Sequence, residues 1–324
     1  MTGRIAVVVA RRSLAVGCSV LLLLIGLVVH HRLSIALPRS GNAVRASGEA
    51  SITVTQGATK TSTTSLLELH DQSGAVTTAW LREPLHLATD YKVLLTYVGH
   101  ETGRGILDLI PERDDLVLLA MQYPFVYGAT WSEKLMLPTR LNEAAGFTVT
   151  GGMLAIAELQ NRGFEVDRLT VLGVSFGSYF AILHGAYDEL VPRTLVVHGG
   201  GDIRGVLTSA FSHRGQPWTG RLLGALGFLF LDPLDPVHHI SRLAPGSLVL
   251  VAARGDPYFP EHGIQRLYER ARPPKAIVWN TGAHVRSSRP DIVAHLVVQI
   301  DAYLDGRLQF DESEGFAGNT APTL

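Results

Sequence analysis

The stretch LTVLGVSFGSYFAILHGA, residues 169–186, constrains the fold more than any other part of this 324-residue chain. Leu169 and Val171 belong to a short, β-branched-rich run that is typical of a strand buried on both faces. Glycines two positions before and after Ser175 permit a sharp turn at that serine, and helical spacing resumes at Tyr179. The pattern predicts a strand, a tight turn with an exposed serine hydroxyl, and a helix whose N-terminus can stabilise an oxyanion.

Strand-like and helical segments alternate from residue 93 onward, which is the pattern of a doubly wound, mostly parallel sheet. Parallel strands are expected at 93–98, 116–121, 169–173, 194–198, 248–252 and 276–279. Helices are expected at 142–161, 176–187, 264–270 and 290–304. Two antiparallel edge strands, 51–55 and 76–81, precede them, with a Thr/Ser-rich segment as their connection. We therefore expect an α/β domain with an eight-stranded sheet over residues 51–305.

Composition limits the class of function. Apolar residues make up 46% of the chain and charged residues 18%, which is enough for one large domain with a full core. The net charge is −1 and no stripe of Lys and Arg is present, which argues against nucleic acid and favours a small, weakly charged substrate. A single cysteine, Cys18, excludes an intrachain disulfide. No metal-ligand spacing or phosphate-binding glycine motif occurs, so the sequence predicts neither metal nor cofactor.

Residues 13–29 form an uncharged apolar run of 17 residues between clusters of arginine and histidine. This length is at the short end for a membrane-spanning helix and at the long end for a signal-peptide core. We expect an uncleaved membrane anchor within residues 1–32, with the main domain outside the cytoplasm. Cleavage after Ala46, which would release a soluble exported protein, and a twin-arginine signal at Arg11 and Arg12 are the alternatives.

Other segments differ in composition from the predicted sheet. Residues 38–50 are small and polar, which predicts a linker over residues 33–50. Residues 203–243 include the very apolar stretch 222–231, and we expect them to form a helical cap over the serine, with core helix as the alternative. The aromatic residues of 123–144 are expected to form a wall of the same site, or else a surface loop. The acidic tail 306–324 is predicted to be disordered.

A nucleophilic serine needs a base to take its proton, and that base needs a carboxylate partner. Reactive groups of an open parallel sheet gather at the carboxyl ends of its strands. Asp256, in the turn ARGDPYFP, and His284, in the turn NTGAH, each follow a predicted strand directly. The chain order Ser175, Asp256, His284 is that of hydrolases with a nucleophile elbow. Asp202, which follows the preceding strand in HGGGD, is the alternative acid.

Over residues 50–305 the chain resembles the α/β-hydrolase superfamily, through GVSFGS, the acid turn GDPYFP and the terminal TGAH. The resemblance implies the α/β-hydrolase fold, with Ser175 as the nucleophile, His284 as general base and then acid, and Asp256 as the orienting carboxylate.

The resemblance also implies an oxyanion hole made by the backbone N–H groups of His100 and Phe176. The turn VGHETG departs from the His-Gly motif usual at this position, but a main-chain donor needs no particular side chain. The expected activity is hydrolysis of carboxylic esters through an acyl-enzyme intermediate. A peptidase, thioesterase or amide hydrolase with the same triad, and a non-catalytic binding module with the hydrolase fold, are the alternatives.

Overall fold

The chain divides into two units, residues 1–36 and residues 37–324. The computed structural model describes residues 18–19, 22–23, 25–32, 35, 37–99, 102–123, 137–212 and 217–308. Part of the predicted anchor, at residues 13–17, 20, 21 and 24, lies outside the described residues, and so does the predicted disordered tail from 309 onward. Among the described residues, no helix combines the length and the apolar character that crossing a membrane requires.

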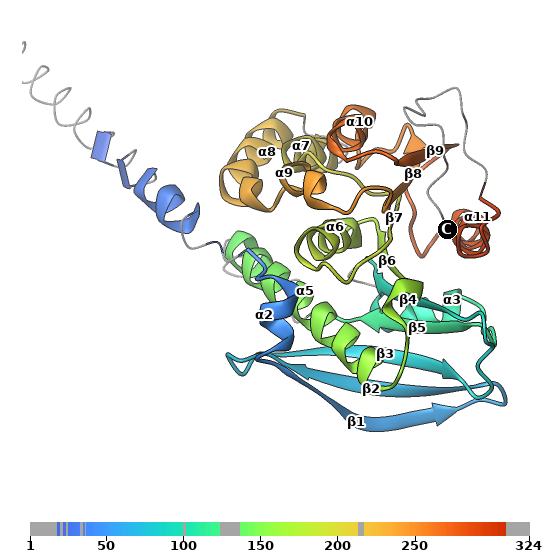
Figure 1. Cartoon of the computed structure of the whole chain (residues 1–324). Helices are drawn as coiled ribbons and strands as arrows, with labels where there is room; N and C mark the ends of the chain where they lie inside the picture. The colour runs from blue at the N-terminus through green and yellow to red at the C-terminus, as the bar shows by residue number, and fades with distance from the viewer. Residues whose placement is uncertain are drawn as a thin grey trace, which may run out of the picture. The chain divides into compact units, whose positions relative to one another are not determined.

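A nine-stranded sheet forms the centre of the second unit (Figure 1). Its strands are β1 (Glu49–Ala58), β2 (Ser62–His70), β3 (Val76–Pro84), β4 (Lys92–Tyr97), β5 (Leu116–Met121), β6 (Leu169–Val174), β7 (Thr194–Val197), β8 (Leu248–Arg254) and β9 (Ala276–Thr281). Their order in space is β1-β2-β3-β5-β4-β6-β7-β8-β9. The first three pair antiparallel and the strands from β4 to β9 pair in parallel, which confirms the predicted α/β sheet.

The prediction of eight strands was wrong by one. Strand β2 occupies the Thr/Ser-rich segment that the sequence suggested was a connection, and it pairs with both β1 and β3. Its Leu67 and Leu69 are buried in the core, while Glu68 between them is half-buried. Threonine is a strong strand former, and the spacing of two residues between Leu67 and Leu69 places both side chains on the same face of the strand.

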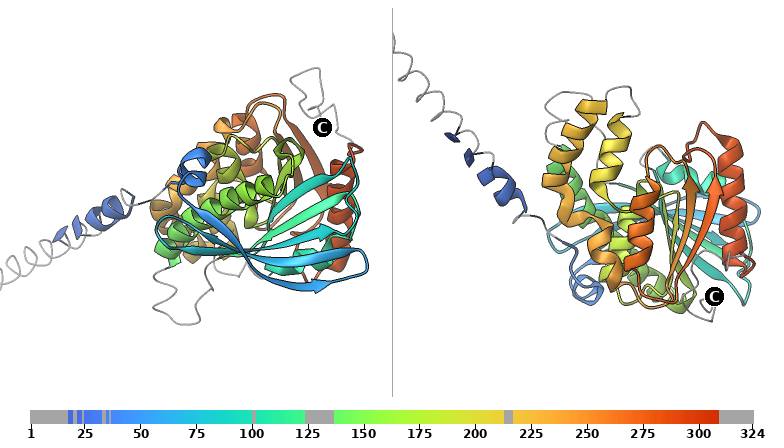
Figure 2. Two further views of the ribbon diagram at one scale, coloured as in Figure 1. Left: turned by 60° about the horizontal axis from the view of Figure 1, so that its bottom comes forward. Right: turned by 90° about the horizontal axis from the view of Figure 1, so that it is seen from above.

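Helices cover both faces of the sheet, as a doubly wound fold requires. The α-helices that the structure describes in this unit are α2 (Gly41–Arg45), α3 (Ile106–Leu109), α5 (Leu137–Asn161), α6 (Gly177–Tyr187), α7 (Ile203–Ser212), α8 (Pro217–Leu231), α9 (Pro236–His239), α10 (Glu261–Arg270) and α11 (Pro290–Leu304). The segment 203–243 between β7 and β8 is helical, as predicted, and its helices α7 and α8 extend away from the sheet side by side (Figure 2).

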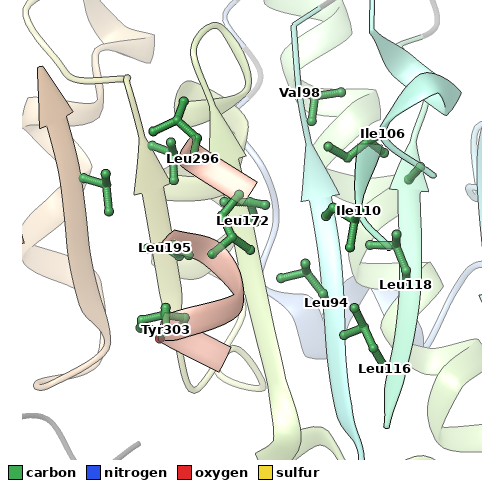
Figure 3. Packing of buried hydrophobic residues seen from close by; sticks show 14 of the residues in the cluster. Leu94, Val98, Ile106, Ile110, Leu116, Leu118, Leu172, Leu195, Leu296 and Tyr303 are labelled. Atoms are coloured by element: carbon green, nitrogen blue, oxygen red, sulfur yellow. The ribbon is translucent and has the colours of Figure 1, made fainter. Parts of the chain in front are cut away.

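Alternate residues of the parallel strands enter two separate hydrophobic clusters. Figure 3 shows Leu195 of β7 on the same side as Leu296 and Tyr303 of α11. The next residue, Val196, packs in the other cluster with Leu267 of α10. Each fully buried side chain of this size stabilises the fold by about 1.5–3 kcal/mol relative to exposure. The apolar strands are therefore held from both faces, which fixes the position of their carboxyl ends.

The predicted linker, residues 33–50, is not free along its whole length. Residues 41–45 form the short helix α2, and Val44 is buried. Arg45 donates from Nη1 to both carboxylate oxygens of Asp188, at 2.9 and 2.8 Å, and the Asp188 side chain is completely buried. This ion pair docks the start of the domain on the C-terminal end of α6, a contact between residues too distant in sequence for composition to reveal.

Candidate active site

Ser175 sits on a strained turn between β6 and α6. Its φ is +54°, which is rare for a residue with a side chain, and its N–H donates to the Val197 carbonyl at 3.0 Å. A Cβ at Gly173 would come within 2.7 Å of α6, and one at Gly177 would collide with the Tyr97 carbonyl. The two glycines that the sequence singles out are thus required because the helix passes so close to the strands.

The three residues predicted as a triad come together at the carboxyl ends of β6, β8 and β9. The Ser175 hydroxyl donates to His284 Nε2 at 2.7 Å, and His284 Nδ1 donates to Asp256 Oδ2 at 2.7 Å. The proton positions are assigned from this network. The other carboxylate oxygen of Asp256 accepts the N–H groups of Tyr258 and Phe259, at 2.8 and 3.1 Å. Asp256 and His284 are both buried, so each side chain is held in a single orientation.

Two aromatic side chains from the turn GDPYFP hold the His284 ring. The Phe259 ring stacks on it at 5.5 Å with an interplanar angle of 26°, and the Tyr258 ring lies at 5.0 Å. Sequence reasoning did not assign a role to either residue. Their position two and three residues after Asp256 could have indicated a role, because their backbone N–H groups bind the Asp256 carboxylate and their rings contact His284.

The alternative acid, Asp202, forms no hydrogen bond with His284 in the described part of the chain. Its Oδ2 lies 3.0 Å from Nε2 of His262, an exposed histidine on α10. The N–H groups of Asp202 and Ile203 donate in turn to the buried carboxylate of Asp235, at 3.0 and 2.7 Å. This geometry favours Asp256 over Asp202 as the partner of His284. The hydrogen bonds to Asp235 instead give the turn at Asp202 a structural role, because they fix the point at which the helical insertion leaves the sheet.

His198, at the carboxyl end of β7, lies at a strand end as the motif HGGGD predicts, but sequence reasoning assigned it no role of its own. Its φ is +45° and it is 3% exposed, yet neither ring nitrogen has a hydrogen-bond partner in the part of the chain that the structure describes. Burial lowers its pKa to about 4, so the ring is neutral at pH 7. The ring centres of His198 and His284 are 6.3 Å apart. A buried polar group without a partner costs about 1–3 kcal/mol, so this imidazole calls for an explanation.

Of the predicted oxyanion pair, only Phe176 can be placed. It precedes α6 as its N-cap residue, and its ring packs against Tyr123 and Phe180, whereas His100 lies outside the described residues. Residues 124–136 of the predicted aromatic wall also lie outside them.

A hollow of about 580 Å³ lies away from the triad. It is lined by charged residues such as Lys92, Asp167 and Arg193, at the opposite ends of the strands. We assign the site by the triad geometry, because the hollow contains no hydrogen-bonded nucleophile and base.

Comparison with known proteins shows the fold. No protein-family model matches the sequence, and no curated protein matches it. The acetyl xylan esterase from Paenibacillus sp. R4 superposes with a TM-score of 0.59 at 14% identity, covering 82% of this chain and 92% of that one. Acetyl xylan esterase 1 from Thermoanaerobacterium sp. JW/SL YS485 gives 0.55 at 13%, covering 82% and 95%. Carboxyl esterase 2 from the fungus Tuber melanosporum gives 0.52 at 14%, covering 79% and 90%. The chain has the α/β-hydrolase fold that its motifs predict.

Proposed function

We propose that this protein is a serine hydrolase that cleaves carboxylic esters through an acyl-enzyme intermediate. The observation that carries the proposal is the continuous hydrogen-bonded array of Ser175, His284 and Asp256, with both of its bonds at 2.7 Å. The three solved structures named above are esterases by title, which supports carboxylic esters as a substrate class.

The array supports a two-step acyl transfer. His284 Nε2 accepts the Ser175 proton as Oγ attacks the ester carbonyl carbon, and the imidazolium then protonates the departing alkoxide as the carbon–oxygen bond breaks. Water attacks the acyl-serine by the same route in reverse, which releases the carboxylic acid and restores the serine. The Asp256 carboxylate keeps the Nδ1 proton in place and stabilises the transient positive charge on His284.

Negative charge that develops on the substrate oxygen needs hydrogen-bond donors in both steps. The backbone N–H of Phe176, at the start of α6, is one donor in this proposal, and the N–H of His100 is the other. The strained φ of Ser175 is consistent with this arrangement, because it sets the hydroxyl beside the first turn of the helix.

Labelling with a fluorophosphonate tests the proposal directly. The wild-type chain should be modified at Ser175, as mapped by mass spectrometry, and Ser175→Ala should lose both the label and hydrolysis of p-nitrophenyl acetate. Ser178→Ala is the matched control, because this buried serine lies in the first turn of α6, three residues after Ser175, and its hydroxyl has no partner among the described residues. A Ser175→Ala variant that keeps wild-type turnover would contradict the mechanism.

We infer in addition that α7 and α8 form a cap that contacts the acyl part of the substrate. Spacings of four, four and three residues place the large exposed side chains of α8 on one side of the helix. These side chains are Trp218, Leu222, Leu226 and Leu229. An apolar surface of this kind suits the hydrocarbon of an acyl chain.

The N-terminal segment is our proposed membrane anchor, with the catalytic unit outside the cytoplasm. In its described helical residues the large apolar side chains are exposed, which leaves them available to lipid. They are Leu22, Leu23, Ile25, Leu27 and Val29. Membrane fractions should hold the protein until detergent is added, and protease should reach the catalytic unit without entering the cytoplasm. A soluble exported product that begins at residue 47 would instead establish cleavage.

A further inference from the structure

His198 gives the triad a neighbour that the hydrolytic reaction does not use. The His198 side chain is almost completely buried, and among the described residues its two ring nitrogens have no hydrogen-bond partner. It stands at the end of β7, between the strands that carry the nucleophile and the acid. Its backbone has a φ of +45°, a conformation in which side chains are rarely found. A buried, unpartnered imidazole held in this conformation indicates that the ring has a ligand to bind.

The groups around His198 make up a metal-ligand set. One ring nitrogen of His198, one of His284 and a carboxylate oxygen of Asp256 all lie within 4.8 Å of one another, and all three side chains are buried. Two imidazoles and one carboxylate are typical ligands of zinc and neighbouring transition metals, whereas Mg²⁺ and Ca²⁺ prefer oxygen alone. Tetrahedral zinc places its ligand atoms about 3.3 Å apart, so side-chain movements of roughly 1 Å would complete the site.

We propose that His198, Asp256 and His284 bind a divalent transition metal of the zinc type, and that its binding switches the hydrolase off. The regulatory half of this inference rests on the proposed function, while the metal site does not.

The chemistry of imidazole explains the inhibition. A neutral ring has one lone pair and one N–H. When a metal binds either nitrogen of His284, the other nitrogen carries the only proton, so no lone pair remains to accept the Ser175 proton. The metal also takes the Asp256 oxygen that orients the ring. Hydrolysis therefore stops without any change in the fold.

Calorimetry with the detergent-solubilised, EDTA-treated full chain tests the site without relying on turnover. We expect one Zn²⁺ per chain, and we expect His198→Asn to weaken that binding by about 100-fold or more. Asparagine is the chosen replacement because it tolerates positive φ. His238→Asn is the matched control, since His238 is an exposed histidine 3.0 Å from an aspartate, Asp232, and its loss should leave zinc binding unchanged. Ser175→Ala should bind zinc as the wild type does.

Ester hydrolysis tests the switch, with each variant compared with its own metal-free rate. One equivalent of Zn²⁺ should suppress wild-type turnover at least tenfold, EDTA should restore it, and Mg²⁺ should have no effect. His198→Asn should keep its turnover at the same zinc concentration. Absence of zinc binding to the wild type, equal binding to His198→Asn, or binding without inhibition would each overturn the proposal. If the wild type proves inactive on esters, the proposed function fails and the calorimetry still decides on the site.

Discussion

Helices α6 and α8 are about equally apolar in sequence but differ in how the fold surrounds them. Most of α6 is buried, including Phe180, Ile182 and His184, because it packs against β4, β6, β7, α5 and α9. The described neighbours of α8 are chiefly α7, α5 and the turn that follows it, and Trp218 and Leu222 are 69% and 59% exposed.

This difference in burial matches the roles that we propose for α6 and α8. The turn before α6 must hold Ser175 within hydrogen-bond reach of His284, so that helix needs contacts on all sides. A cap must leave an apolar side open to the substrate. The burial of an apolar helix is therefore set by the elements that pack against it, and not by its own composition.

The largest effect is expected at Asp256, the proposed triad acid. Asp256→Asn should lower kcat for p-nitrophenyl acetate by about 10⁴-fold, because the amide leaves the imidazole in the wrong tautomer. Asp202→Asn is the control and should change kcat little, since Asp202 pairs with His262. A larger loss of kcat from Asp202→Asn than from Asp256→Asn would identify Asp202, in the turn after β7, as the acid.

A second prediction compares one apolar truncation on each helix. Ile182→Ala, at a fully buried position of α6, should lower the free energy of unfolding in urea by about 2–5 kcal/mol. Leu222→Ala, on the exposed side of α8, should lower it by no more than about 0.5 kcal/mol. Similar losses for the two variants would show that α8 is covered as fully as α6.

The third prediction concerns the C-terminal end of α6. Burial of Asp188 raises its pKa, but hydrogen bonds from His184 and Arg45 outweigh burial and bring the pKa below its usual value. The stability from this carboxylate is therefore present above its unfolded pKa of about 3.9 and is lost as the pH falls through the lower folded value.

Removing the guanidinium tests this contact. Arg45→Ala should lower the free energy of unfolding at pH 7 by about 1.5–3 kcal/mol and make the loss of stability at acid pH less steep. Arg39→Ala, at an exposed position just before α2, is the control. If both variants unfold like the wild type from pH 7 down to pH 3, the contact between α2 and α6 contributes nothing to stability.

The smallest effect is expected on the cap. Leu222→Asp should raise KM for a butanoyl ester by about tenfold more than for an acetyl ester, because each methylene in apolar contact contributes about 0.8 kcal/mol. Val298→Asp puts the same charge at an exposed apolar position of α11 and should leave the acyl-length profile unchanged. Equal changes for both esters in Leu222→Asp would exclude α8 from the acyl site.

The sequence by itself determined those features that depend on local pattern. Short β-branched runs and helical spacing predicted the parallel strands and the helices between them to within a few residues, because burial on both faces leaves a continuous apolar signal. The glycines around Ser175 predicted the strained turn. The positions of Asp256 and His284 after strands predicted that they meet Ser175, since parallel strands bring their carboxyl ends to one edge.

Only the tertiary structure decided what depends on contacts between distant segments. A Thr/Ser-rich stretch became β2 because two neighbouring strands offered backbone partners, and part of a polar linker became α2 because Asp188 offered a buried carboxylate. The turn HGGGD showed no sign that His198 would be sealed beside His284 with both nitrogens unpartnered among the described residues. Sequence patterns report which side chains prefer burial, whereas the groups that a buried side chain meets are set by the packing of the whole sheet.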